Sequence, residues 1–366
     1  MGTDRDTKLC VTHIERFATH DGPGIRTVVF FKGCPLHCPW CANPETQDFR
    51  PQLLYDVKKC VGCRACEQVC PTGAIYFRGL GEGAGVCTLC SQCEEACPQG
   101  AIEFVGDVMT VGEVLAEVER DKEYYGGDGG LTASGGEPFA QQEGLLAMLR
   151  ESRRLGIGTA VETTGNTPGE ALWAAEPFVD HFLYDFKHVD DGVLRGVTGG
   201  DGKRIKENLA WLLGHCPQKV TVRIPVIPGF NAASGGAGAG GADAGGTDAD
   251  GTGTTGTGAG KTGAGGAGTT GEGDGPVLVQ MLRYLHSIGA KRVSLLPYHT
   301  LGKEKYQKLG REYTWGCGGV ASAAASAADQ LSPSDLVSDV APLREEDLAW
   351  ALQLAQGLGL TADVGG

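Results

Sequence analysis

The sequence contains no long apolar run. None of its segments approaches the roughly 20 consecutive apolar residues that a helix needs to cross a bilayer, and Met1–Cys10 lacks the apolar stretch of a secretory signal. Basic residues are also scarce, because 31 Lys and Arg stand against 45 Asp and Glu and the formal net charge is −14. Nucleic-acid binders usually present a basic face, so this balance argues against such a partner. We expect a cytoplasmic protein, a monomer, that binds neither membranes nor nucleic acid.

The 14 cysteines give little reason to expect disulfide bonds. Disulfides are rare in the reducing cytoplasm. Eleven of the cysteines fall into three tight groups, and only Cys10, Cys216 and Cys317 stand alone. Grouped thiols in such a compartment are typical of metal or iron–sulfur ligands. The cysteine pattern therefore predicts metal centres.

Strand and helix patterns alternate over most of the 366 residues. Strands are expected at Arg26–Lys32, Gly130–Ala133, Gly158–Glu162, Phe178–Lys187, Lys219–Val226 and Arg292–Pro297, and helices at Thr110–Tyr124, Ala140–Leu155, 203–214, 276–288 and Leu343–Gly357. Thr110 and Glu113 have the spacing of a capping box. Repeated strand–helix units predict an α/β fold with a parallel sheet or partial barrel, whose chemistry lies at the carboxyl ends of the strands.

Two stretches show no apolar periodicity. Residues 232–275 are almost entirely Gly, Ala, Thr, Ser and Asp, with 19 glycines in 44 positions, so burial cannot offset their ordering entropy. We expect a disordered insert there and a low-complexity loop at 316–342. The core is expected to comprise residues 1–50 and 105–366, interrupted by a separate unit at 51–104 that carries eight cysteines.

The first cysteine group follows a strand directly. Its spacing, Cys34-x3-Cys38-x2-Cys41, offers three thiolates on one short loop. Three thiolates hold three irons of a [4Fe-4S] cube and leave the fourth iron open for inner-sphere chemistry. A zinc site is the alternative, and zinc needs a fourth ligand.

The other two groups repeat one pattern. Each reads C-x2-C-x2-C-x3-C-P, which is the spacing of bacterial ferredoxins with two clusters, where the fourth cysteine of each run ligates the other cluster. One cube is therefore expected on Cys60, Cys63, Cys66 and Cys97, and a second on Cys87, Cys90, Cys93 and Cys70. These two auxiliary clusters either relay electrons or only stabilise a small ferredoxin-like α+β insert.

Polar motifs follow several of the expected strands. Ser134-Gly-Gly-Glu-Pro138 is either a ligand-binding turn, in which Gly136 lets the backbone approach, or a simple tight turn. Glu162 and Thr163 either bind ligand or cap a helix. Alternation places Asp185 and Lys187 on the same side of their strand, as ligand contacts or as a salt bridge. Arg223 and His299 also stand at strand ends, with either structural or binding roles.

These motifs resemble a known family. The Cys34-Cys38-Cys41 loop resembles the signature of the radical S-adenosylmethionine (SAM) superfamily, and Asp21–Arg26 (DGPGIR) with Trp40–Glu45 (WCANPE) resembles glycyl-radical enzyme activating enzymes. The resemblance implies a partial (β/α)6 barrel of the TIM type. It also implies a SAM molecule chelated by the open iron, with Trp40 near the adenine. The SAM contacts implied in this way are Trp40, Cys41, Ala42, Gly136, Asp185, Phe186, Lys187 and His299.

The same resemblance implies an activity. Members reductively cleave SAM to a 5′-deoxyadenosyl radical, which takes a hydrogen from the Cα of one glycine in a partner glycyl-radical enzyme. Flavodoxin or ferredoxin is the implied electron donor. Asp21, Gly22, Gly24 and Arg26 either cradle the partner peptide or form a turn in which Asp21 pairs with Arg26. Two other hypotheses stay open: a radical SAM maturase with auxiliary clusters, and a non-catalytic electron-transfer polyferredoxin.

Overall fold

The structure is a computed structural model that describes residues 3–76, 79–80, 86–232, 276–315 and 340–365. Positions 233–275 and 316–339, which hold most of the two expected low-complexity stretches and the isolated Cys317, lie outside the described residues. Among the described residues, no helix has the length and apolar character needed to cross a bilayer.

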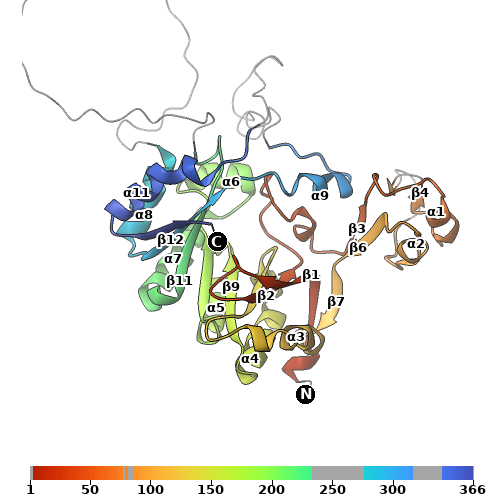
Figure 1. Cartoon of the computed structure of the whole chain (residues 1–366), viewed down its shortest axis with the longest axis horizontal. Helices are drawn as coiled ribbons and strands as arrows, with labels where there is room; N and C mark the ends of the chain where they lie inside the picture. The colour runs from red at the N-terminus through yellow and green to blue at the C-terminus, as the bar shows by residue number, and fades with distance from the viewer. Residues whose placement is uncertain (1–2, 77–78, 81–85, 233–275, 316–339, 366) are drawn as a thin grey trace, which may run out of the picture.

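One large sheet organises the core (Figure 1). In the described residues its nine strands lie in the order β13-β12-β11-β10-β9-β8-β2-β1-β7. The strands are β1 (Lys8–Ala18), β2 (Arg26–Phe31), β7 (Asp107–Thr110), β8 (Gly130–Gly135), β9 (Gly158–Thr163), β10 (His181–Asp185), β11 (Val220–Val226), β12 (Arg292–Pro297) and β13 (Thr361–Val364). All neighbours from β2 to β13 are parallel, whereas β1 pairs antiparallel with β2 and β7. The α/β fold with an open, partly wound parallel sheet is therefore confirmed, and the sheet does not close within the described residues.

Helices connect the parallel strands. They are α3 (Val111–Glu119), α4 (Gln142–Arg154), α5 (Gly169–Ala175), α6 (Asp191–Thr198), α7 (Gly202–His215), α8 (Val277–Ser287), α9 (Lys303–Lys308) and α11 (Ala349–Gly357). Apolar side chains of the helices share one buried cluster with those of the strands, for example Leu145, Leu209 and Leu282 with Val161 and Val222. Because this helix layer covers the sheet, most residues of β9 and β10 are buried. They do not show the alternation of buried and exposed residues that is typical of a strand with one face in solvent.

Several element ends differ from expectation. The helix after Thr110 ends at Glu119, and a separate 3-10 turn follows at Lys122–Tyr124. Thr110 does form the capping box, since its hydroxyl accepts from the Glu113 N–H and its own N–H donates to the Glu113 carboxylate at 2.7 Å. The strand expected from Phe178 begins only at His181, because Glu176–Phe178 form a 3-10 turn that contains a proline.

Strand β1 was not expected from the sequence. Its pairing with β2 shifts register twice, between Val11 and His13 and between Glu15 and Ala18. Phe17 lies in the second shift with a φ of +62°, a left-handed conformation that is unusual for a non-glycine residue. These bulges break the apolar alternation on which a strand prediction depends.

Residues 52–105 form a lobe beside the main sheet (Figure 1). It contains β3 (Gln52–Tyr55) paired with β6 (Ile102–Val105), β4 (Ile75–Tyr76) paired with β5 (Gly79–Leu80), α1 (Ala65–Val69) and α2 (Gln92–Glu95). The lobe has a small apolar cluster of its own around Leu53, Tyr55 and Ile102. Residues of the expected ferredoxin insert thus fold around their own core.

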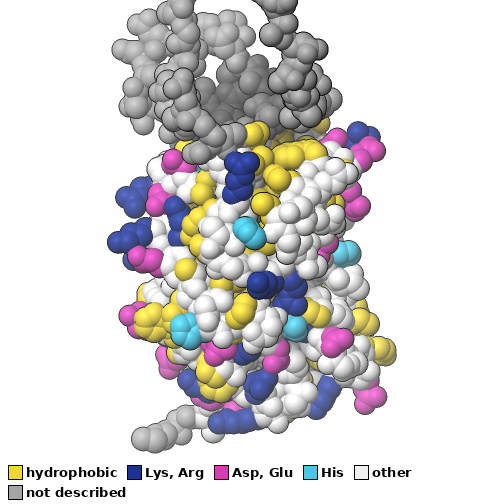
Figure 2. Space-filling view, turned by 90° about the vertical axis from the view of Figure 1, so that its left-hand side faces the viewer, with side chains coloured by type: hydrophobic (Ala, Val, Ile, Leu, Met, Phe, Trp, Pro, Cys, Tyr) yellow, Lys and Arg dark blue, Asp and Glu magenta, His cyan; other side chains and the backbone are white. Residues whose placement is uncertain are grey.

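Charges of both signs are intermixed on the molecular face that Figure 2 shows. Lys and Arg side chains lie among Asp and Glu side chains there, without a continuous basic surface. Acidic side chains outnumber basic ones in the whole sequence, which gives the net charge of −14.

Candidate active site

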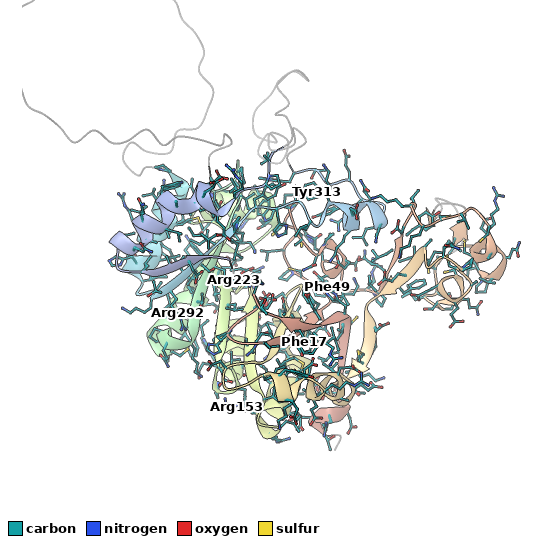
Figure 3. All side chains as sticks on the ribbon, in the orientation of Figure 1. Phe17, Phe49, Arg153, Arg223, Arg292 and Tyr313 are labelled. Carbon is teal, nitrogen blue, oxygen red and sulfur yellow. The ribbon has the colours of Figure 1, made fainter. Side chains whose placement is uncertain are left out.

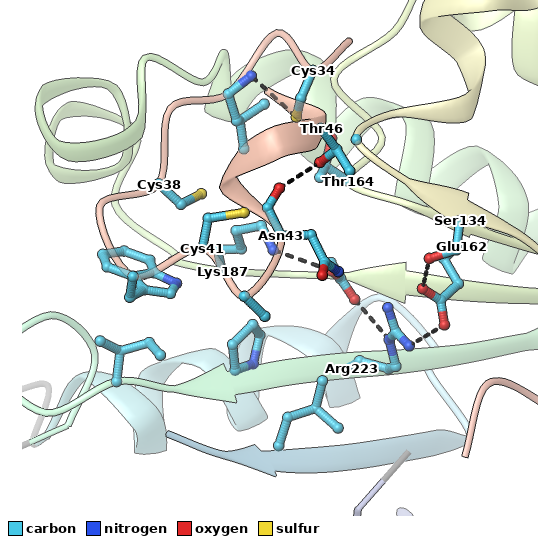
Figure 4. Close-up of a pocket in the computed structure, with 18 of the residues that line it drawn as sticks. Cys34, Cys38, Cys41, Asn43, Thr46, Ser134, Glu162, Thr164, Lys187 and Arg223 are labelled. Carbon is cyan, nitrogen blue, oxygen red and sulfur yellow. Dashed lines mark hydrogen bonds and ion pairs between the residues drawn. The ribbon is translucent and has the colours of Figure 1, made fainter. Parts of the chain in front are cut away.

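The loop after β2 carries the first three cysteines. Hydrogen bonds from the Gly33 N–H to the Thr46 carbonyl (2.7 Å) and from the Cys34 N–H to the Gln47 carbonyl (3.1 Å) close the loop on itself. Cys34, Cys38 and Cys41 all line one cavity (Figure 4). His37 is exposed and does not line that cavity, so it is not placed to complete a zinc site with them.

These three thiols are held away from water. Burial raises the pKa of Cys41 to about 12, and it also raises the pKa values of Cys34 and Cys38. A free thiol with a raised pKa stays protonated at neutral pH, whereas a coordinating metal deprotonates it. Three such donors around one cavity fit a [4Fe-4S] cluster with an open iron.

The opposite wall of the cavity comes from the carboxyl ends of five parallel strands. Its residues are Ser134, Gly135, Gly136, Glu162, Thr164, Asp185, Lys187, Arg223, Pro225, Ile227, Leu296, Pro297, Tyr298 and His299. They lie at or just beyond the ends of β8, β9, β10, β11 and β12. The sheet therefore gathers residues that are far apart in sequence, as a parallel α/β fold requires.

Gly136 is the point of closest approach between strand β8 and the cysteine loop. A Cβ at this position would lie 2.3 Å from the Gly33 carbonyl oxygen and 2.8 Å from that of Thr46. No side chain fits at such distances, so glycine is required for the two backbones to meet. The Gly-Gly turn thereby joins the strand ends to the loop and also lines the cavity.

Glu137 is a positioning residue to which the sequence analysis gave no role. Its side chain is buried, and it accepts hydrogen bonds from the Thr163 hydroxyl (2.8 Å) and from the hydroxyl and N–H of Thr164 (2.6 and 2.9 Å). These bonds fix the end of β9 against the end of β8. Thr163 thus contacts Glu137 rather than capping the next helix. The signal in the sequence was an acidic residue directly after two glycines.

Four charged side chains form a buried network beside the cavity (Figure 4). Arg223 donates to Glu162 at 2.6 Å and to Asp185 at 2.7 Å, and Asp185 accepts from Lys187 at 3.1 Å. Glu162 also accepts from the Ser134 hydroxyl. The side chain of Arg223 is only 9% exposed. Figure 3 shows Arg223 in the interior of the molecule, at the main sheet.

The network explains how these charges tolerate burial. Burial disfavours the charged form of each group, but the Arg223 guanidinium and Lys187 still hold the pKa of Asp185 below its usual value. In turn the Asp185 carboxylate outweighs desolvation and raises the pKa values of Lys187 and Arg223. Asp185 and Lys187 therefore lie on the same side, as alternation predicted, and they are both a salt bridge and part of the cavity wall.

Phe186 does not lie where it was expected. Its ring is fully buried, stacks on Tyr284 of α8 with centroids 5.5 Å apart, and is not part of the cavity wall. The physical reason is the alternation of the strand, which turns Phe186 toward the helix layer when its two neighbours face the cavity. The Phe186 side chain therefore does not face the cavity in which SAM was expected.

Trp40 lines the cavity from the cysteine loop. Its ring packs against Phe230 at 4.6 Å and against Trp315 at 4.7 Å between centroids, so neighbouring aromatic rings support its position in the lining. Ala42 and His299 also belong to the lining, with His299 exposed at the rim.

The segment from Asp21 to Arg26 is a turn whose base is buried. Arg26 is fully buried and donates to the Thr132 hydroxyl at 2.9 Å and to the carbonyls of Asp128 and Leu131. It is therefore not exposed to contact a partner peptide, in contrast to its expected place in a cradle, because its donors hold the turn onto β8. Gly24 is exposed, and its φ of +70° suits the turn.

Asp21 faces the charged network rather than Arg26. Burial, and next the negative charge of Glu162, raise the pKa of Asp21 to about 6. The expected pairing of Asp21 with Arg26 is not formed, since Arg26 donates instead to backbone carbonyls and to Thr132. The turn thus connects to the cavity wall through Glu162.

The remaining eight cysteines surround two separate small cavities. Cys60, Cys63, Cys66 and Cys97 line one of them, and Cys70, Cys87, Cys90 and Cys93 line the other. Backbone N–H groups donate to several of the sulfurs, for example from Ala74 to Cys70 and from Ala101 to Cys97, both at 3.2 Å. The structure brings together the same two sets of four that the swapped ferredoxin pattern predicts. We name these sets the Cys60 cage and the Cys87 cage.

Comparisons with known proteins give the same picture. The radical SAM superfamily model matches residues 83–234, and a 4Fe-4S binding domain matches residues 53–76. The first match begins after the Cys34 loop, so the assignment of that loop depends on the geometry above.

Three curated proteins are similar to this chain. One is the isethionate sulfite-lyase activating enzyme of Nitratidesulfovibrio vulgaris, 38% identical over 86% of this chain and 91% of that protein. Another is the choline trimethylamine-lyase activating enzyme of Oleidesulfovibrio alaskensis, 37% identical over 84% of this chain and 89% of that protein. The (2S)-3-sulfopropanediol sulfolyase activating enzyme of Bilophila wadsworthia is 45% identical over 62% of this chain and 78% of that protein.

Proposed function

Because the chain belongs to the glycyl-radical enzyme activating enzymes, which are radical SAM enzymes, we propose that the cavity between the Cys34 loop and the strand ends binds a [4Fe-4S] cluster together with SAM. The chain reductively cleaves SAM and generates a glycyl radical on a partner glycyl-radical enzyme. One observation carries the proposal: three thiols from one loop and a network of four charged side chains line the same cavity.

The three thiols have a different role from the other residues that line the cavity. Cys34, Cys38 and Cys41 would hold the cluster with three thiolates, so that one iron would stay open to SAM. When bound, the cluster supplies one electron and SAM supplies the 5′-deoxyadenosyl radical. Lys187 donates one hydrogen bond to Asp185, and an ammonium has three donors, so donors remain for the SAM carboxylate.

Other residues orient SAM and exclude water. The backbone of Gly136 would bind the amino-acid end of SAM, and the Trp40 ring would hold the adenine. Ile227, Leu296 and Pro297 form an apolar part of the wall. An apolar wall keeps water and oxygen from a reactive radical.

The protein binds three [4Fe-4S] clusters in this proposal, one in the cavity and one in each cage of the insert. A cluster held by four cysteines has no open iron, so the clusters of the two cages would relay electrons rather than bind SAM. A flavodoxin or a ferredoxin is the electron donor in this scheme, and the chain acts as a monomer.

We further propose that the partner is a glycyl-radical lyase of the isethionate or sulfopropanediol type. The support is the names of the relatives: the activating enzymes of sulfopropanediol sulfolyase and of the Oleidesulfovibrio alaskensis isethionate sulfite-lyase are 45% and 42% identical, each over 62% of this chain. Over 86% and 84% of the chain, the isethionate sulfite-lyase and choline trimethylamine-lyase activating enzymes are 38% and 37% identical. The exposed turn at Pro23 and Gly24, beside Asp21, is the candidate contact for the partner's glycine loop.

A panel of partners tests this assignment. The reduced, cluster-loaded protein is mixed with SAM and, in separate reactions, with purified isethionate, sulfopropanediol and choline lyases. We expect the glycyl-radical EPR doublet to form fastest with one of the two sulfonate lyases. A faster signal with the choline lyase contradicts the partner class, and the absence of a doublet with every glycyl-radical enzyme tried contradicts the activase function itself.

A further inference from the structure

Helix α9 lies between the cysteine loop and the insert (Figure 1). It is a short helix that follows β12, and it contacts both the 3-10 turn Pro44–Thr46 of the cysteine loop and strand β3 of the insert. No site residue so far described belongs to it. Its side chains nevertheless form hydrogen bonds and ion pairs both with the cysteine loop and with the insert.

Two α9 side chains hold the cysteine loop. Lys305 donates to the Glu45 carboxylate at 2.6 Å and to the Asn43 side-chain carbonyl at 2.7 Å. The Tyr306 hydroxyl is buried and donates to backbone carbonyls of the loop, that of Pro39 at 3.2 Å and that of Cys38 at 3.4 Å. The backbone at a proposed cluster ligand is thus fixed by a residue more than 260 positions away in the sequence.

The other side of α9 faces the insert. Glu304 accepts from Lys58 at 2.7 Å, and Lys308 pairs with Asp56 at 3.2 Å. A small cavity between helix and insert is lined by Tyr55, Asp56, Val57, Lys58, Glu304, Gln307 and Lys308. Each of the two ion pairs is weak at such a surface, but both act on one segment directly before Cys60.

That segment forms part of the Cys60 cage. Tyr55 and Ala101 line the cage, Tyr55 also lines the cavity against α9, and the Asp56 N–H donates to the Ala101 carbonyl at 2.8 Å. The Cys87 cage differs, because none of its lining residues in the described chain also lines the cavity shared with α9. The Cys60 cage is therefore the one in contact with α9.

We propose that α9 is the element that positions the catalytic cysteine loop relative to the insert, with Lys305 and Tyr306 as positioning residues, and that the Cys60 cage is the auxiliary site next to the catalytic loop. This inference rests on the proposed cluster and SAM binding. To the proposed function it adds which of the two cages lies nearer to the catalytic cysteine loop, and which side chains hold that loop in place.

The burial of Glu45 explains why Lys305 matters. The Glu45 side chain is only 5% exposed, and its ion pair with Lys305 offsets the cost of burying the carboxylate. Without the ammonium, the 3-10 turn around Glu45 must move toward water. The Thr46 carbonyl in that turn accepts the hydrogen bond from the Gly33 N–H that closes the cysteine loop. A movement of the turn would therefore also displace the cysteines of the loop.

The first experiment compares two substitutions on the same helix. Lys305→Met removes the ion pair, whereas Lys303→Met removes an equal charge at a position without an ion pair among the described residues. SAM affinity is measured by equilibrium binding, and the reduced catalytic cluster is followed by EPR with and without SAM. We expect Lys305→Met to weaken SAM binding by about 10- to 100-fold, as for other residues that orient metal ligands, and to change the SAM-dependent EPR spectrum. Lys303→Met is expected to match the wild type, and Lys305→Arg to recover part of the affinity.

A milder variant keeps the test decisive if Lys305→Met loses its iron. Tyr306→Phe removes only the hydroxyl that contacts the loop carbonyls. We expect unchanged iron content with an altered EPR spectrum of the catalytic cluster. Wild-type spectra and SAM affinity in Tyr306→Phe, or in iron-loaded Lys305→Met, overturn the positioning role.

The second experiment tests which cage is proximal. Cys63→Ser and Cys90→Ser each remove one exposed ligand, from the Cys60 and Cys87 cages respectively. A nearby paramagnet speeds the spin relaxation of the catalytic cluster. We expect Cys63→Ser to slow that relaxation and Cys90→Ser to leave it near the wild-type value; the reverse result overturns the assignment. If the wild type itself neither binds SAM nor forms 5′-deoxyadenosine, the proposed function fails, whereas a functional wild type with unaffected variants contradicts only this inference.

Discussion

Replacing Cys38 by alanine is expected to abolish SAM cleavage. Cys38 is one of three thiols that line the main cavity, and its sulfur is buried. Two remaining thiols cannot hold a cube that needs three protein ligands, so the open iron for SAM is lost. The measurement is the amount of 5′-deoxyadenosine formed from SAM under dithionite reduction, with iron content determined in the same sample. We expect no product above that of the protein without iron.

Cys10→Ala is the matched control for this loss. Cys10 lies on β1 and lines none of the three cysteine-containing cavities of the described chain. Its backbone exchanges hydrogen bonds with Gln141 that the substitution leaves intact. Cys10→Ala should therefore cleave SAM like the wild type. If Cys38→Ala still forms 5′-deoxyadenosine, the Cys34 loop is not the SAM-cleaving site.

Arg223→Met is expected to give the largest loss of stability among single substitutions in the cavity wall. The guanidinium bridges Glu162 and Asp185, both nearly buried. Removing one partner of a buried ion pair leaves an uncompensated charge, which typically costs about 3–5 kcal/mol. Equilibrium unfolding in denaturant measures this change. The same variant should lose SAM affinity, since Asp185 and Lys187 keep their positions through Arg223.

A surface arginine supplies the comparison. Arg153 pairs with Asp180 at 2.6 Å, but its side chain is 48% exposed (Figure 3). Arg153→Met should change the free energy of unfolding by at most about 1 kcal/mol, as is typical of exposed ion pairs. Adding Glu162→Gln and Asp185→Asn to Arg223→Met should restore part of the lost stability because the unpaired charges are gone. Equal losses for Arg223→Met and Arg153→Met contradict the role given to the buried network.

The parts of the site that the sequence predicted depend on local spacing. Cys34, Cys38 and Cys41 share one short loop, so their spacing alone places them together. Asp185 and Lys187 are two residues apart, and strand alternation alone puts them on one side. In the insert, local spacing brings together three cysteines of each run, and the fourth joins the other cage as the two-cluster ferredoxin pattern implies.

The parts of the site that could not be predicted from the sequence depend on tertiary contacts. Arg26 stands beside an exposed glycine turn, yet it is fully buried because β8 supplies carbonyl partners from more than 100 residues away. Phe186 was assigned to the cavity with its neighbours, although alternation turns its ring toward α8. Lys305 and Tyr306 end the segment that begins at His299, yet the sequence gave them no role of their own, because their partners lie in the cysteine loop.

The most direct test of the central claim follows the hydrogen atom itself. A partner glycyl-radical enzyme is prepared with deuterium at the Cα of its glycines and mixed with the reduced protein and SAM. If the 5′-deoxyadenosyl radical takes that atom, the deuterium appears in 5′-deoxyadenosine, and one deuterium is gained for each glycyl radical formed. Mass spectrometry of the product measures the transfer. The account predicts singly deuterated 5′-deoxyadenosine together with a glycyl-radical EPR signal; a glycyl radical that forms while the product stays unlabelled would contradict it.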